Sequence, residues 1–373
     1  MVERGSHPLI EVLGLVAPGT PFRDGLDRVL QAKRGALVVV GDDPGVLSIC
    51  TGGFLLDAEF SPQRLAELAK MDGAIILAAD ASRIARANVH LVPKSAIPTS
   101  ETGTRHRTAE RVARSLEVPV IAVSGSMSTI SVYRDDRRHI VQPTQRLVDR
   151  AGQALSTLHR FKSRFDTAIA SLSTLEVEDT VSVRDVVAVI QPGEMVVRIA
   201  DEIDDYLVEL GEDWRLIHLQ LQELAGGAER ALRLVVGDYV QDRGSAEGSG
   251  QAGTPPRADR DQLIDRAVGA LHRLSADELV DPARVAGTLG LGGPLGGLDV
   301  EVEARGYRLL HRLPRISDVI IDRIVERFTD LPGILQASLA DLEKVGGVGG
   351  ATARAVKDGL ARIVEASILE RYD

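Results

Sequence analysis

The spacing of the apolar residues changes near residue 146, and this change limits the folds that the chain can adopt. Before it, short strand-like runs alternate with helical stripes, and Ala36–Val40 and Ala74–Ala78 are uninterrupted apolar runs. Such runs are typical of strands that are buried on both faces of a sheet. After residue 146 the spacing is mostly helical. The sequence therefore predicts an α/β N-terminal domain with a mixed central sheet, followed by all-α segments.

The first 145 residues carry several further element signals. Apolar spacing predicts helices over 22–33, 62–71 and 104–116, and β-rich runs predict strands over 89–92, 118–123 and 130–133. Between 36–40 and 46–50 lies Asp42-Asp43-Pro44-Gly45, which has the composition of a turn. We expect these two runs to pair as a hairpin.

Three domains are expected, over 1–145, 146–300 and 301–373. In the helical middle domain, Pro192-Gly193 and Gly226-Gly227 are the clear breakers, and the Gly-, Ser- and Pro-rich residues 243–260 predict a flexible loop. The last domain contains an internal repeat of a short helix, a tight loop and a longer helix. The longer helices are expected over 318–328 and 352–366.

The formal charge of −10 lies almost wholly in the middle domain. The three segments hold 17, 16 and 11 basic residues against 16, 26 and 12 acidic ones. This balance argues against a protein whose whole surface binds a polyanion. A single cysteine, Cys50, fits a reducing compartment, and no apolar stretch approaches the ~18 residues of a membrane span. We expect a cytoplasmic protein.

Two segments of the first domain suggest a ligand site. Asp72-Gly73 enters the strand at 74–78, where a carboxylate beside a glycine could bind an ion or a hydroxyl; the alternative is a plain turn. Thr104 is predicted to cap the helix at 104–116, and Arg105, His106 and Arg107 follow it. Cations at a helix start favour an anionic ligand such as phosphate. The alternative is a solvated, arginine-rich surface turn.

Two loops carry weaker signals. Ser124-Gly125-Ser126-Met127-Ser128 could line a pocket or form a simple polar turn. Near the C-terminus, a glycine hairpin could hold a DNA phosphate through backbone N–H groups, or could be an ordinary helical corner. Its candidate DNA-binding residues are Gly346, Gly347, Val348, Gly349, Gly350 and Thr352. The first unit of the repeat, at 313–317, lacks such glycines, so we expect it to contribute less.

Taken together, these motifs resemble a known family. Asp72-Gly73-Ala74, followed by Arg105-His106-Arg107, resembles the paired signature of diadenylate cyclase domains, and the segments 87–93, 97–99 and 101–104 agree with it. With the helical middle and the C-terminal helix-hairpin-helix pair, nearly the whole chain resembles the bacterial DNA integrity scanning family. No Gly-x-x-x-x-Gly-Lys-[Ser/Thr] loop is present, which disfavours a P-loop motor or similar ATP-dependent repair enzyme.

The resemblance implies that two ATP react to give cyclic di-AMP and two pyrophosphates, with Mg²⁺ or Mn²⁺ present. It implies catalytic roles for Asp72, Arg105, His106 and Arg107, with Asp72 as the metal ligand. It implies Ser124 as a further nucleotide contact, although the loop that follows Ser124 carries none of the basic residues found in some relatives. The implied ATP-binding residues are Asp72, Gly73, Leu91, Gly103, Thr104, Arg105, His106, Arg107, Thr108 and Ser124.

The resemblance also implies partners and an assembly. Family members are octamers in which two tetramers face each other through their cyclase domains. Binding of branched double-stranded DNA at the C-terminal domain is expected to inhibit synthesis, and a nucleoid-associated location follows from it. The competing interpretation is a nucleotide-binding scaffold for DNA repair without cyclase activity, which the uncharged loop after Ser124 would favour.

Overall fold

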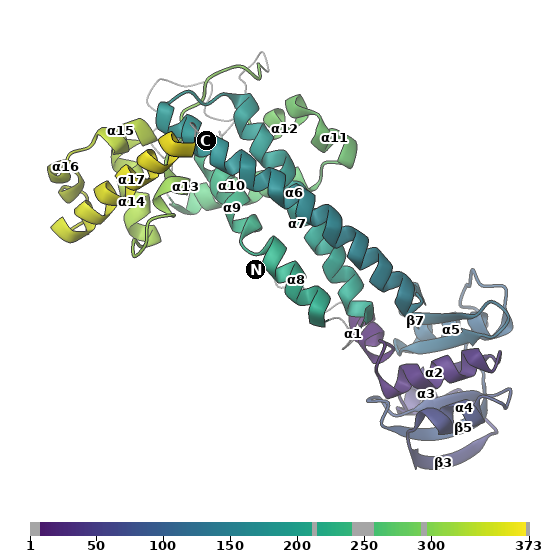
Figure 1. Cartoon of the computed structure of the whole chain (residues 1–373). Helices are drawn as coiled ribbons and strands as arrows, with labels where there is room; N and C mark the ends of the chain where they lie inside the picture. The colour runs from purple at the N-terminus through teal and green to yellow at the C-terminus, as the bar shows by residue number, and fades with distance from the viewer. Residues whose placement is uncertain (1–7, 211–214, 241–256, 292–296, 371–373) are drawn as a thin grey trace. The chain divides into compact units, whose positions relative to one another are not determined.

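The computed structural model describes residues 8–210, 215–240, 257–291 and 297–370 (Figure 1). Two compact units are present. One comprises the residues up to 153 together with 202–220, and the other comprises 154–201 together with the residues from 221 onward. Helices α6 (Thr144–Glu178) and α7 (Val183–Leu210) each contribute to both units.

The first unit is built on one mixed sheet, which confirms the predicted fold class. The strands are β1 (Ala36–Val40), β2 (Cys50–Thr51), β3 (Phe54–Glu59), β4 (Ala74–Leu77), β5 (Arg83–Leu91), β6 (Val120–Ser124), β7 (Thr129–Arg134) and β8 (Arg137–Val141). Their order is β2-β5-β4-β1-β6-β7-β8, with β3 also paired to β5. The pair β1–β4 is parallel and the other described pairs are antiparallel.

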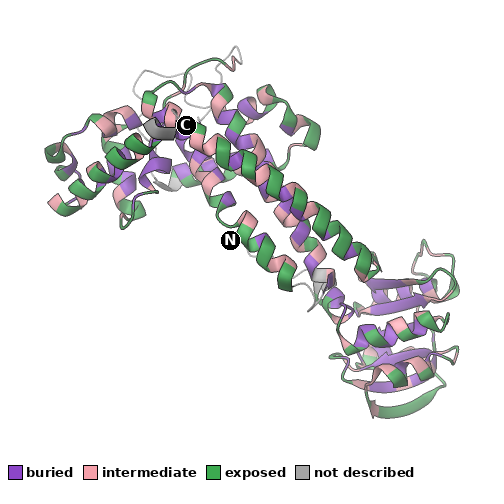
Figure 2. Cartoon of the chain, in the orientation of Figure 1, coloured by how far each residue is buried: buried purple, intermediate pink, exposed green. Residues whose placement is uncertain are grey.

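Both faces of the central strands are covered by helices. On β1, Val38 and Val40 belong to one apolar core, whereas Leu37 and Val39 belong to the other. The first core is completed by α1 (Pro8–Leu15), α2 (Pro21–Gln31) and α4 (Pro62–Leu68), and the second by α3 (Pro44–Ser48) and α5 (Thr104–Leu116). Burial on both sides explains why these strands read as uninterrupted apolar runs (Figure 2).

The expected hairpin over 36–50 is wrong, because residues 44–48 form helix α3. The Asp43 side chain accepts a hydrogen bond from the Val46 N–H at 3.1 Å, and Pro44 occupies the first helical turn. An acidic N-cap followed by proline is a strong helix start, and here it outweighs the β-propensity of the run. The strand that follows, β2, pairs with β5 instead.

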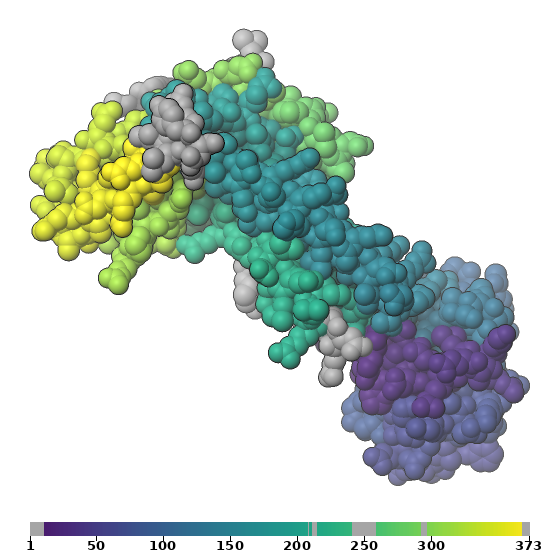
Figure 3. Space-filling model, viewed as in Figure 1, coloured from purple at the N-terminus to yellow at the C-terminus, as the bar shows by residue number. Residues whose placement is uncertain are grey.

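The second unit is helical, as predicted, apart from an isolated bridge between Ser182 and Glu301. Its remaining helices are α8 (Arg215–Ala225, which begins in the first unit), α9 (Ala228–Tyr239), α10 (Arg257–His272), α11 (Ala276–Val280), α12 (Pro282–Thr288), α13 (Tyr307–Leu310), α14 (Asp318–Phe328), α15 (Leu331–Gln336), α16 (Leu339–Glu343) and α17 (Gly350–Glu370). In Figure 3 the side chains of α14 to α17 pack into one body at the yellow end of the chain.

Two expectations for the helical middle are corrected. Pro192-Gly193 does not end a helix, because α7 continues through both residues. A side chain at Gly193 would come within 2.6 Å of the Phe165 ring, so the glycine permits a close approach to α6. Of the expected loop at 243–260, residues 243–256 lie outside the described residues, and 257–260 form the first turn of α10.

A buried ionic network joins α6, α9 and α13 within the second unit. The Arg308 guanidinium forms an ion pair with Glu176, and Arg308 Nη1 donates to Ser173 Oγ at 3.0 Å. Tyr239 Oη also donates to Glu176, at 2.6 Å. The carboxylate of Asp238 accepts the backbone N–H groups of Tyr307 and Arg308 at 2.7 and 2.9 Å. Buried charges are tolerated only when they are paired in this manner.

Asp238 gives the stability of this unit a pH dependence. Burial, together with the nearby charge of Glu176, raises the pKa of Asp238 to about 7. Because an unfolded aspartate has a pKa of about 3.9, the folded chain binds this proton more tightly. The contribution to the free energy of unfolding is full below about pH 4 and is lost as the pH rises through 7. Urea unfolding of Asp238→Asn should show a flatter dependence between these limits; a slope equal to that of the wild type would contradict the assignment.

Across the described residues, no helix is long and apolar enough to cross a membrane.

Candidate nucleotide site

One edge of the sheet collects the segments that the sequence singled out. Strands β1 and β4 are parallel, so both begin at this edge. Strand β6 runs antiparallel to β1 and ends there, with Val123 opposite Ala36. The end of β5 reaches the same edge, with Val89 opposite Ala74. Segments that are far apart in sequence therefore meet at the entrance to β4.

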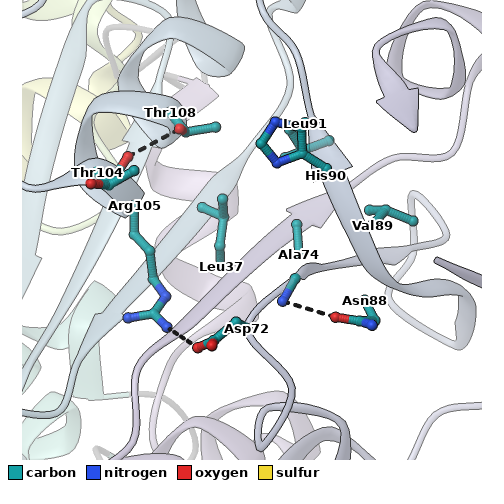
Figure 4. Close-up of a pocket in the computed structure, with 11 residues that line it drawn as sticks. Leu37, Asp72, Ala74, Asn88, Val89, His90, Leu91, Thr104, Arg105 and Thr108 are labelled. Atoms are coloured by element: carbon teal, nitrogen blue, oxygen red, sulfur yellow. Dashed lines mark hydrogen bonds and ion pairs between the residues drawn. The ribbon is translucent and has the colours of Figure 1, made fainter. Parts of the chain in front are cut away.

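A cavity of about 320 Å³ lies at this edge (Figure 4). Of the predicted nucleotide residues it brings together Asp72, Gly73, Leu91, Thr104, Arg105 and Thr108. Its other lining residues are Leu37, together with Ala74, Asn88, Val89 and His90 from the segments that carry the family resemblance but were not predicted as binding residues. The lining combines the apolar residues Leu37, Ala74, Val89 and Leu91 with the cation Arg105, which suits a ligand with an aromatic ring and a negative charge.

Asp72 and Arg105 face each other at the mouth of this cavity. Arg105 Nη2 lies 3.3 Å from Asp72 Oδ1, and the Asp72 side chain is fully exposed (Figure 4). The loose geometry and the exposure make this ion pair weak, so both groups remain available to a ligand. The guanidinium also lies over Gly35, where a side chain would come within 2.4 Å of Arg105 Nη1.

Gly73 is required by close packing against β5. Its N–H donates to Asn88 Oδ1 at 3.1 Å, and a side chain on Gly73 would lie 2.3 Å from the Asn88 backbone carbon. Asn88 itself adopts a left-handed conformation with φ of 57°, which asparagine tolerates better than most residues. This contact fixes the position of Asp72, the residue that precedes Gly73.

A second cavity, of about 590 Å³, adjoins the first and shares Asp72, Thr104 and Arg105 with it. It brings in three more predicted residues, Gly103, His106 and Ser124. It also contains Gly125 and Ser126, from the loop that the sequence suggested could line a pocket, and Lys33, Gly35 and Val123, which no ligand motif predicted. The two cavities together contain nine of the ten predicted ATP-binding positions, and Arg107 lines neither.

Helix α5 begins between the two cavities. The N-cap is Gly103 and not the expected Thr104, which is the first helical residue, and no side chain caps this helix start. The free N–H groups of the first turn and the positive end of the helix dipole are therefore open to an anion. Thr108 Oγ1 donates back to the Thr104 carbonyl at 3.0 Å.

His106 lines the second cavity. Burial lowers the pKa of His106, and the charges of Arg138 and Arg105 act in the same direction against that of Glu101. Its Nε2 atom is buried and makes no hydrogen bond to any described residue. The imidazole packs edge-to-face on Tyr133, whose hydroxyl donates to Glu101 at 2.8 Å. The ring is thus held in place with one polar atom unsatisfied.

Arg107 points away from the cavities and holds the preceding loop. Its Nε and Nη2 atoms lie 3.4 and 3.3 Å from the carbonyl oxygens of Glu101 and Thr102. Farther along α5, Glu110 accepts a hydrogen bond from the Ser100 N–H at 3.1 Å, and Arg111 donates to the Ile97 carbonyl at 3.0 Å. Helix α5 therefore fixes the segment 97–102 that leads into its own start.

The donor set fits a metal ion that arrives with a nucleotide. No cluster of three or more His, Cys, Asp or Glu residues that could hold a metal was found among the described parts of the chain. Mg²⁺ typically retains several waters and uses one or two carboxylates plus substrate phosphates. Asp72, an exposed carboxylate beside an anion-binding helix start, matches that requirement.

The two C-terminal hairpins share one backbone conformation. In the second hairpin Gly347 has a φ of +87°, and at the equivalent position of the first hairpin Arg315 has a φ of +64°. The internal repeat seen in the sequence is therefore also a geometric repeat. Only the second hairpin has glycine at this left-handed position, and its Gly349 has no neighbour within 4 Å of the position a side chain would take. That backbone is open to a close approach.

Two protein-family models match this chain, over residues 23–138 and 141–295. Residues 23–138 match the family model described as DisA bacterial checkpoint controller nucleotide-binding. Residues 141–295 match the model described as DisA bacterial checkpoint controller linker region.

The similarity to known proteins extends over almost the full length of this chain. DNA integrity scanning protein DisA from Frankia casuarinae is 49% identical over 96% of this chain and 96% of its own length. The corresponding protein from Streptomyces coelicolor is 50% identical over 96% of this chain and 93% of its own. Among solved structures, DacA from Staphylococcus aureus is 24% identical over 32% of this chain and 82% of its own, with a TM-score of 0.28.

Proposed function

Because the chain belongs to the DNA integrity scanning protein DisA family, we propose that it condenses two ATP molecules into cyclic di-AMP and two pyrophosphates. The observation that supports this most strongly is the pair of adjoining cavities at one sheet edge. One offers an apolar wall for an adenine ring, the other offers cations for phosphates, and both share Asp72 and Arg105.

Each residue then has a distinct task. Leu91 and its apolar neighbours contact the adenine, while the start of α5 and Arg105 hold the α-phosphate. Asp72 binds the Mg²⁺ or Mn²⁺ ion and orients the attacking 3′-hydroxyl. When bound, that ion lowers the pKa of the hydroxyl and neutralises charge on the phosphates. Arg107 acts through the 101–102 loop and is a positioning residue. Phosphoryl transfer depends mainly on such positioning and charge neutralisation.

The reaction requires two copies of the domain. In each nucleotide the 3′-hydroxyl must attack the α-phosphate of the other, so two cavities have to face each other. We propose that the chain forms a homo-octamer in which two tetramers meet through their cyclase domains. We further propose that it works in the cytoplasm in association with the nucleoid.

The C-terminal hairpins are the proposed DNA-binding element, and branched double-stranded DNA is the proposed partner. Backbone N–H groups can hold phosphates without a strongly basic surface, which reconciles DNA binding with a near-neutral domain. Bound DNA is expected to inhibit synthesis, so that cyclic di-AMP reports intact DNA.

Incubation with ATP and Mn²⁺, with and without a four-way junction, tests this function. We expect a dinucleotide product by chromatography and less of it when the junction is added. ATP binding without any product would instead support the competing proposal, a nucleotide-binding repair scaffold. A synthesis rate that the junction leaves unchanged would remove the coupling from the account.

Gly349→Val should weaken junction binding by roughly tenfold or more, which corresponds to the loss of about 1.5 kcal/mol from one hydrogen bond to a charged phosphate. The fold should persist, because the added side chain meets open space. Fluorescence anisotropy measures the affinity, and Ser317→Val at the equivalent position of the first hairpin is the matched control. Loss of affinity in the control alone would assign DNA binding to the other hairpin.

A further inference from the structure

The second cavity contains a lysine that no motif predicted. Lys33 follows α2, and it lines the cavity together with Gly103, Thr104 and Arg105 from the start of α5. The Lys33 N–H donates to the Leu30 carbonyl at 2.8 Å, and the Arg34 N–H donates to the Val29 carbonyl at 3.1 Å. These bonds close the helix in the manner that usually uses a left-handed glycine. Here the left-handed residue is Lys33, with φ of 52°.

The loop after β6 packs directly on the backbone of this lysine. A side chain at Gly125 would lie 2.4 Å from the Lys33 carbonyl oxygen, so only glycine permits this contact. The contact holds Lys33 beside Ser124 and Ser126 across the cavity wall. A non-glycine residue in a strained conformation that the surroundings enforce is a common feature of functional sites.

The polar groups of this cavity suit a multiply charged anion. Lys33 and Arg105 are its cations, and Asp72, on the wall shared with the first cavity, is its one carboxylate. Among the described residues, the Lys33 ammonium group has no ion-pair partner. The buried Nε2 atom of His106 is also without a hydrogen bond in the part of the chain that the structure describes. A lysine without an ion-pair partner and a histidine with an unbonded ring nitrogen are therefore among the residues that line this cavity of about 590 Å³.

We propose that the second cavity holds the β- and γ-phosphates of ATP and that Lys33 binds them. This inference rests on the proposed function, since it places the adenosine in the first cavity and the α-phosphate at the wall that both cavities share. The residues 125–128 carry no charge, so Lys33 supplies from the α2 side the cation that this loop lacks.

The same position gives Lys33 a role in the reaction. The bond between the 3′-oxygen and phosphorus forms while the bond from that phosphorus to the oxygen bridging to the β-phosphate breaks. The 3′-hydroxyl releases its proton to the solvent, and pyrophosphate leaves with the electron pair of the broken bond. Negative charge grows on the leaving group, and the Lys33 ammonium ion stabilises it most at that stage.

Two ligands separate this subsite from the rest of the site. 3′-Deoxy-ATP carries the β- and γ-phosphates but has no nucleophile, so it binds without reacting. Cyclic di-AMP lacks both phosphates. Isothermal titration of Lys33→Gln should show affinity for 3′-deoxy-ATP lowered by roughly tenfold or more, as expected for one lost charge-assisted contact. Its affinity for cyclic di-AMP should stay within about twofold of the wild-type value, because no contact to that ligand is removed.

Matched variants complete the test. Arg34→Gln removes the adjacent exposed charge, which lines neither cavity, and should change neither affinity. Lys33→Arg should retain most of the affinity for 3′-deoxy-ATP. Equal affinity of Lys33→Gln and wild type for 3′-deoxy-ATP, or an equal loss for both ligands, would overturn the proposal. If the wild type binds 3′-deoxy-ATP but forms no cyclic di-AMP from ATP, the proposed function fails while the Lys33 subsite can still be measured.

Discussion

Asp72→Asn is expected to lower the rate of cyclic di-AMP formation by roughly 10³-fold or more, the range found when a charge-stabilising group is removed from a phosphoryl-transfer site. The amide keeps the shape of the side chain but cannot neutralise a metal ion or orient the 3′-hydroxyl as a carboxylate does. The fold should be unaffected, because the Asp72 side chain is fully exposed and its contact with Arg105 is weak. Product formation and the thermal unfolding midpoint are the two measurements.

Asp135→Asn provides the matched control for this variant. Asp135 lies in the turn between β7 and β8 with φ of 53°, a conformation that asparagine adopts readily. The substitution removes one negative charge from the same unit, and Asp135 lines neither cavity. The control should retain wild-type activity. Robust synthesis by Asp72→Asn would remove Asp72 from the catalytic account.

Arg308→Met is expected to lower the free energy of unfolding of the helical unit by about 3–5 kcal/mol, the typical cost of removing one partner of a buried ion pair. In this variant Glu176 stays buried but loses the positive charge of Arg308 that balances it. Tyr239 is then its remaining partner among the described residues. Urea denaturation followed by circular dichroism measures the change. The effect should be among the largest that any single substitution produces in this unit.

Two comparisons make that result interpretable. Arg184→Met breaks an exposed ion pair with Asp299 and should cost no more than about 1 kcal/mol. Combining Arg308→Met with Glu176→Leu removes both partners of the ion pair and should recover part of the lost stability, because the Glu176 carboxylate is then no longer left buried without its cation. The double variant is compared with the sum of the changes in the free energy of unfolding of Arg308→Met and Glu176→Leu. Equality of the two values would show that the two residues are not coupled in the way the contacts indicate.

The sequence predicted best the elements whose local signals agree with their tertiary environment. Helices α5 and α14 begin and end where apolar spacing placed them, over 104–116 and 318–328. Strand β3 was missed because its apolar residues Phe54 and Leu55 are exposed and show no alternation. Strand β8 was missed because its first residues are charged and exposed, and it owes its structure to pairing with β7.

The candidate site was only partly accessible from sequence. The motifs around Asp72 and Arg105 stood out because carboxylate, glycine and arginine residues occur there in a recognisable order. Lys33 and Gly35 were missed, since nothing in their local sequence points to a ligand. Their place depends on the parallel pairing of β1 with β4 and on the packing of Gly125 against Lys33, which only the fold shows.

A quantitative balance of the reaction tests the central claim most directly. The purified full-length chain is incubated with ATP and Mn²⁺, and ATP, cyclic di-AMP and pyrophosphate are quantified together by chromatography and mass spectrometry. The account predicts that each cyclic di-AMP formed accompanies the loss of two ATP and the release of two pyrophosphates. Release of ADP and inorganic phosphate, or of AMP without a cyclic dinucleotide, would contradict it.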